Sequence, residues 1–102
     1  MTKKIYTLEE LIHIIGEVVK DFEVKKAILF GSYAKNIPTP NSDIDLVIDS
    51  EGRLLNIKFY GLLQELIDNL EKNVDLIEIS EIKKGSAIDE EIRKEGVVVY
   101  EK

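Results

Sequence analysis

The chain has 102 residues, of which 44% are hydrophobic and 33% are charged. These proportions are typical of a folded soluble protein, and the length gives room for one domain, residues 1–102, with one core. Fourteen basic and 20 acidic residues give a net charge of -6, so direct binding to duplex nucleic acid is not expected. The absence of cysteine excludes disulfides and thiolate chemistry, so a metal site is expected to use oxygen ligands.

The hydrophobic pattern contains neither a secretion signal nor a membrane span. The N-terminal segment carries acidic residues within its apolar pattern, and no stretch of about 20 consecutive apolar residues follows it. We therefore expect a cytoplasmic protein that does not contact a membrane. The oligomeric state stays open, including a homo-oligomer.

The first predicted elements are a helix and a buried strand. Thr7 and Glu10 have the spacing of a capping box, and apolar residues follow at helical intervals, which predicts a helix over about residues 8–22. A short continuous apolar run at residues 27–30 then ends at Gly31. Such a run is typical of a strand that is buried on both faces.

The middle of the chain is predicted to form a loop, a strand and a long helix. Prolines, asparagines and serines in residues 31–42 indicate a loop, with one short helical turn that starts at Ser32. Residues 44–48 form an apolar run interrupted by Asp45, which predicts a second strand. Leucine and isoleucine at helical spacing then predict a helix over about residues 53–71.

The last third of the chain is predicted to add strand, helix and strand. Residues 74–79 and 97–100 are apolar runs, and residues 87–95 have a helical pattern capped by Ser86 and ended by Gly96. We interpret this last helix as a solvated amphipathic helix. The order of elements predicts an α/β or α+β domain with a small mixed β-sheet flanked by helices.

Three acidic side chains are expected to converge at one edge of this sheet. Asp43 and Asp45 are two residues apart in an extended segment, so they share a face, about 6.5 Å apart. The crossover between the second and third strands should be parallel, which brings Asp75 to the same edge. If the first strand is antiparallel to the second, the ten residues 33–42 return Gly31 and Ser32 to that edge as well.

The chemistry that suits this arrangement is nucleotidyl transfer. Three adjacent carboxylates repel one another unless a cation binds, and hard divalent ions prefer oxygen ligands. Two ions about 3.5 to 4 Å apart can stabilise the attacking and leaving oxygens of an in-line displacement. Gly31 has no side chain to obstruct phosphates, and the N–H groups at Ser32 can receive phosphate oxygens at a helix N-terminus.

The segment GSYAKNIPTPNSDIDLVID, residues 31–49, resembles the signature of the polymerase-beta-like nucleotidyltransferase superfamily. That signature consists of glycine and serine, a spacer of ten residues, and two aspartates separated by one residue. Together with KAILF before it and VDLIEI after it, the chain is similar to the minimal nucleotidyltransferases. These proteins are often MntA-type antitoxins that are paired with a HEPN-domain ribonuclease toxin.

The resemblance implies a polymerase-beta-like fold and a role for each matching residue. Gly31 and Ser32 match the triphosphate-binding loop, Asp43 and Asp45 match the metal-binding pair, and Asp75 matches the third acid, a metal ligand or general base. The implied reaction is transfer of AMP from ATP, with two Mg²⁺ ions or with Mn²⁺. The implied acceptor is a hydroxyl, and in several toxin modules it is a tyrosine of the partner HEPN toxin.

The chain departs from the commoner form of the signature at two positions. Lys35 and Asn36 stand where an arginine and a glycine are usual. A lysine can still contact phosphate, so Lys35 is a further nucleotide-binding candidate, but it lacks the bidentate fork of arginine. The alternative is therefore a non-catalytic antitoxin that neutralises its toxin by binding alone.

Other polar residues are expected to have structural roles. Asp49 and Glu78 are predicted to be solvated, and His13, on the first helix, is predicted to be partly buried and is excluded from the site. The motif DIDLV also fits a phosphatase pattern in which the apolar strand precedes the first acid. Here TPNS precedes that acid and the apolar run follows it, which disfavours the phosphatase interpretation.

Overall fold

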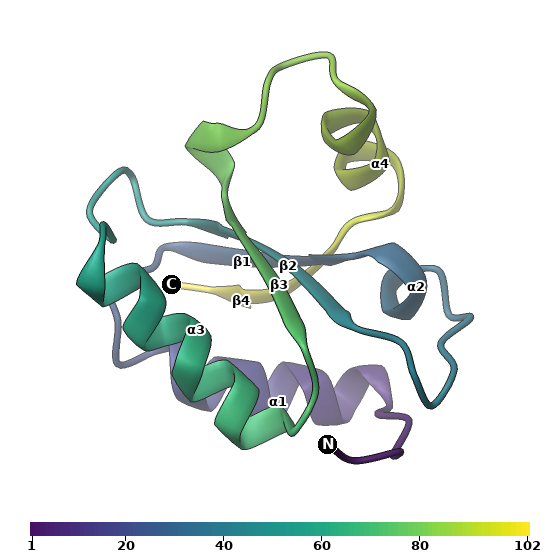
Figure 1. Cartoon of the computed structure of the whole chain (residues 1–102). Coiled ribbons are helices and arrows are strands. Elements are labelled where there is room, and N and C mark those ends of the chain that lie inside the picture. The colour runs from purple at the N-terminus through teal and green to yellow at the C-terminus, as the bar shows by residue number, and fades with distance from the viewer.

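The computed structural model describes residues 1–102 and contains one four-stranded sheet with helices on both of its faces (Figure 1). None of the helices combines the length and the apolar character that are needed to cross a bilayer. The elements in chain order are α1 (Leu8–Val19), β1 (Lys26–Phe30), α2 (Gly31–Ala34), β2 (Ile44–Asp49), α3 (Ile57–Leu70), β3 (Val74–Glu78), the 3₁₀ turn η1 (Ile79–Glu81), α4 (Ala87–Glu95) and β4 (Val97–Glu101).

The sheet has the strand order β3-β2-β1-β4. β1 is antiparallel to both β2 and β4, whereas β2 and β3 are parallel and are joined by the crossover through α3. Both orientations that the sequence argument required are therefore confirmed, and so is the mixed α/β class. Helices α1 and α3 cover one face, and α4 stands over the opposite face, against β1 (Figure 1).

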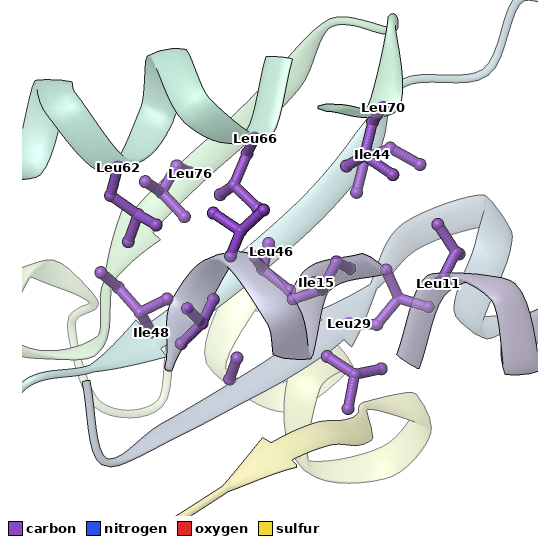
Figure 2. Packing of buried hydrophobic residues seen from close by; sticks show 14 of the residues in the cluster. Leu11, Ile15, Leu29, Ile44, Leu46, Ile48, Leu62, Leu66, Leu70 and Leu76 are labelled. Atoms are coloured by element: carbon purple, nitrogen blue, oxygen red, sulfur yellow. The ribbon is translucent and has the colours of Figure 1, made fainter. Parts of the chain in front are cut away.

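The hydrophobic core lies between the sheet and the pair α1 and α3. Along β2, Ile44, Leu46 and Ile48 are fully buried toward these helices, so the alternate residues point to the other face. Figure 2 shows this core from close by, with labelled side chains from α1, α3 and the three strands β1, β2 and β3: Leu11, Ile15, Leu29, Ile44, Leu46, Ile48, Leu62, Leu66, Leu70 and Leu76.

Helix α1 starts where the sequence predicts and ends earlier. The Thr7 hydroxyl accepts from the Glu10 N–H at 3.1 Å and the Glu10 carboxylate accepts from the Thr7 N–H at 2.9 Å, which confirms the capping box. The predicted end at residue 22 is wrong, because the Phe22 N–H bonds to the Val19 carbonyl and tightens the chain into a turn toward β1. His13 is exposed on this helix rather than partly buried.

Helix α3 starts at Ile57, four residues after the predicted start at residue 53. The Ser50 hydroxyl and carbonyl accept from the N–H groups of Leu54 and Arg53, so this segment forms a turn instead of a helix. Ser50 Oγ also donates to the Glu78 carboxylate at 2.6 Å. Glu78 is buried by this contact, and its predicted solvation is wrong.

Candidate active site

The three predicted acids lie on the face of the sheet that α1 and α3 leave uncovered. Asp45 on β2 and Asp75 on β3 are direct partners in the parallel register, so their side chains share a face. Asp43 is two residues before Asp45 and shares the same side, whereas Ile44 between them is buried in the core. Asp45 is partly buried, and Asp43 and Asp75 are exposed. The structure therefore brings all three carboxylates to one edge of the sheet.

The pKa of Asp45 reflects its burial and the proximity of these carboxylates. Its pKa is raised from 3.8 to about 6, first because burial penalises the charged carboxylate and then because of the negative charges of Asp75, Asp43 and Glu91. The negative charge of the ionised Asp45 carboxylate is therefore energetically unfavourable in this environment. Its environment holds excess negative charge, which a cation would neutralise.

The acids suit a divalent cation by chemistry and charge. Asp43, Asp45 and Asp75 provide the carboxylate oxygens that hard divalent ions prefer. No group of three or more His, Cys, Asp or Glu side chains is already closed into a metal-binding cage in this structure. A bound ion would therefore have to draw the three carboxylates together, and the relief of their mutual repulsion favours that movement.

The backbone at Gly31 lies so close to Asp45 that an added Cβ would force the Asp45 side chain to move. Gly31 has a φ of +74°, and a Cβ atom there would lie 2.9 Å from Cγ of Asp45 and would collide with its Oδ2. Gly31 is the first residue of α2, whose turn is closed by a bond from the Lys35 N–H to the Gly31 carbonyl at 3.1 Å. The first N–H groups of a helix have no partner within it, and at α2 they lie beside the acids. Ser32 follows in this turn and is partly buried.

The loop that leads to Asp43 is held by a buried lysine. Lys72 is 3% exposed, and its Nζ donates to the carbonyl of Pro40 at 3.0 Å and to that of Thr2 at 3.4 Å. The Ile44 N–H also donates to the Asn73 carbonyl at 3.0 Å. The segment before β3 therefore fixes the chain on both sides of Asp43.

Helix α4 contributes two acidic residues that the sequence interpretation did not place at the site. Glu91 Oε2 accepts a hydrogen bond from the Gly31 N–H at 3.1 Å, and it lies 3.9 Å from Lys35 Nζ. Glu95 Oε2 also lies 3.9 Å from Lys35 Nζ. The interpretation of α4 as a solvated amphipathic helix holds, since none of its residues is buried, but the contact of Glu91 with the glycine turn was not foreseen. Lys35 is directed toward α4 rather than toward an open phosphate position.

A sequence signal for this contact does exist. Glu91 and Glu95 are four residues apart on one helix, where two like charges repel unless a cation lies between them. A nearby basic residue would reduce this repulsion, and Lys35 Nζ lies 3.9 Å from both carboxylates. Only the tertiary structure shows which lysine it is.

Replacement of Gly31 by alanine should disturb Asp45. The new Cβ would displace the Asp45 carboxylate, so Gly31→Ala should weaken Mn²⁺ binding by about tenfold or more in calorimetry. Gly52→Ala is the matched control, because Gly52 has a φ of +77° with nothing within 4 Å of an added Cβ. Both variants should lose about 1 to 2 kcal/mol of stability from left-handed strain, but Gly52→Ala should keep its Mn²⁺ affinity. Equal Mn²⁺ affinity in both variants would contradict this account.

The raised pKa of Asp45 predicts a pH-dependent cost to stability without metal. Between pH 3.8 and about 6 the unfolded state loses its proton before the folded state, so the free energy of unfolding falls as pH rises. The rise in pKa corresponds to at most about 3 kcal/mol, which partial exposure reduces to about 1 to 2 kcal/mol. In EDTA, Asp45→Asn should stabilise the chain by this amount at pH 8 and should have little effect at pH 3.5. Urea unfolding at both pH values measures the difference, and no gain at pH 8 would refute the crowding.

Comparison with known proteins identifies the family. Residues 12–102 match the polymerase beta nucleotidyltransferase family. A Methanocaldococcus jannaschii protein, MJ0126, whose name proposes protein adenylyltransferase activity, is 40% identical over 75 residues, which cover 70% of this chain and 76% of that protein. The protein adenylyltransferase MntA of Thermococcus cleftensis is 34% identical over 85 residues, which cover 79% of this chain and 86% of that protein.

Solved structures share the same fold. A toxin-antitoxin complex with AMP-PNP contains a chain that superposes with a TM-score of 0.76 at 25% identity, over 89% of this chain and 73% of that chain. A complex of a tri-AMPylated Shewanella oneidensis HEPN toxin with its MNT antitoxin gives a TM-score of 0.71 at 21% identity, over 94% of this chain and 74% of that chain. The family match over most of the chain settles its identity: the protein belongs to the polymerase beta nucleotidyltransferase family.

Proposed function

We propose that this nucleotidyltransferase transfers AMP from ATP to a tyrosine hydroxyl of a partner HEPN toxin and thereby acts as its antitoxin. The observation that carries this proposal is the position of Asp45, whose carboxylate faces both the Gly31 backbone and Asp75 on the neighbouring strand. This arrangement sets a turn suited to phosphate beside carboxylates suited to metal. The names of the similar proteins support adenylyl transfer and a toxin partner.

The triphosphate would bind at the turn that begins α2. The first N–H groups of a helix, which have no partner within the helix, can donate to anionic oxygens, and Gly31 lets the backbone approach those oxygens without a side chain in the way. Ser32 would add a hydroxyl donor. Lys35 would contribute positive charge once a phosphate competes with its carboxylate partners.

Asp43, Asp45 and Asp75 would hold the divalent cations, Mg²⁺ or Mn²⁺, and two such ions would neutralise the carboxylates together with part of the triphosphate charge. When bound, the ions supply electrostatic stabilisation of the attacking and leaving oxygens. The protein keeps the three ligands on a rigid sheet edge, and Lys72 fixes the loop before Asp43.

The transfer itself is an in-line displacement. The acceptor hydroxyl oxygen forms a bond to the α-phosphorus of ATP, the bond from that phosphorus to the bridging oxygen breaks, and pyrophosphate leaves. The hydroxyl proton passes to a carboxylate, for which we propose Asp75. Asp75 is exposed on β3, an edge strand, so a tyrosine on the surface of another protein can reach it.

The double variant Asp43→Asn plus Asp45→Asn tests the catalytic roles. The purified chain is incubated with α-labelled ATP, Mg²⁺ and a HEPN toxin as the acceptor. Label transfer to the toxin should fall by about a thousandfold or more, because both proposed metal ligands lose their charge. Asp21→Asn plus Asp68→Asn removes the same charge from exposed positions and should transfer label at the normal rate.

The same variant separates catalysis from neutralisation by binding. If it still binds the toxin but no longer protects cells, then the transfer reaction is the antitoxin mechanism. If it still protects cells fully while binding as the wild type does, then the chain acts by occupying its toxin, and the catalytic proposal is wrong.

A further inference from the structure

The Glu91 carboxylate occupies a position that is built to recognise an anion. Its Oε2 accepts from the Gly31 N–H at 3.1 Å and lies 3.9 Å from the Lys35 ammonium. A backbone N–H at the start of a helix and a neighbouring ammonium are the two kinds of group that bind phosphate oxygens. Glu91 therefore makes the contacts that we propose for the triphosphate.

The contact lies beside the acids, where the proposed nucleotide would compete for it. The negative charge of Glu91 adds to the crowding around Asp45, so in the empty protein it increases the local repulsion. Its side chain is 31% exposed, which leaves solvent into which the carboxylate can turn. Helix α4 itself packs against β1, so the side chain can leave the glycine turn without movement of the helix.

We propose that Glu91 is an intramolecular competitor of the substrate, which holds the phosphate-binding turn until a polyphosphate displaces it. This inference rests on the proposed function and names the residue that controls access to its site. Displacement of Glu91 frees the Gly31 N–H and removes one of the two carboxylates beside Lys35, whose other partner is Glu95. When pyrophosphate leaves, the carboxylate returns to the turn and hinders rebinding.

The competition predicts tighter binding of phosphates when Glu91 loses its charge. Calorimetry with Mg²⁺-ATP and with Mg²⁺ and inorganic tripolyphosphate should show about tenfold tighter binding to Glu91→Gln than to the wild type, because the neutral amide is a weaker acceptor. Tripolyphosphate has no base or ribose, so a gain in affinity for both ligands would show that Glu91 competes with the phosphates. Circular dichroism and thermal unfolding check that the variants fold.

Two matched variants isolate the contact with Gly31. Glu95→Gln removes the same charge from the other partner of Lys35 but has no bond to Gly31, and its affinity should change by less than about threefold. Glu90→Gln removes a charge from an exposed position on the same helix and should bind as the wild type does.

The outcomes separate the competitor from the proposed function. Equal gains in affinity in Glu90→Gln and Glu91→Gln would overturn the proposal that Glu91 competes with substrate. No gain in affinity in Glu91→Gln, while the wild type binds Mg²⁺-ATP, would do the same. Either result would leave the proposed function standing. A gain in affinity in Glu91→Gln alone, without label transfer to the toxin, would support competition by Glu91 and count against the proposed function. Failure of every variant and of the wild type to bind either ligand would overturn both.

Discussion

The active site depends on the close approach of the Gly31 backbone to the Asp45 carboxylate. β1 and β2 are antiparallel with Phe30 opposite Asp45, so the residue that follows β1 must pass directly beside the acid. Only glycine combines the left-handed backbone with the space that this passage needs. The same approach puts the first N–H groups of α2 next to the carboxylates. The proposed phosphate site and the proposed metal site would thus both follow from one strand pairing.

The charge pattern of the site works against the stability of the metal-free fold. Burial and three neighbouring acids raise the pKa of Asp45 to about 6, so that ionisation of this carboxyl at neutral pH costs the folded state stability relative to the unfolded chain. Such a cost is typical of functional sites, where groups are arranged for a ligand rather than for the empty protein. Lys35 offsets part of the acidity through Glu91 and Glu95. The positive charge at the site is therefore shared between its own carboxylates and the anion that it is proposed to bind.

The sequence predicted the sheet topology and the placement of the three acids, because alternation along a strand and the parallel crossover are general rules. Helix ends were less predictable. Helix α3 starts later than predicted because the Leu54 N–H donates to the Ser50 hydroxyl, which in turn donates to the buried Glu78 carboxylate. The sequence also does not place Glu91 at the site, because the charge pattern of α4 is the same for a helix in solvent and for one whose carboxylate contacts another element. Only the packing of α4 over β1 brings its carboxylate to Gly31. Local rules thus predicted the elements, whereas contacts between distant side chains required the three-dimensional structure.

The most direct test of the site is a crystal structure of the chain soaked in Mn²⁺, with anomalous diffraction to locate the metal. We expect a peak within about 2.0 to 2.6 Å of carboxylate oxygens of Asp43 and Asp45, with Asp75 turned toward the same ion or its neighbour. The Gly31 backbone should remain packed against Asp45. A peak elsewhere on the surface, with Asp75 directed away from the other two acids, would rule out a metal site shared by the three carboxylates.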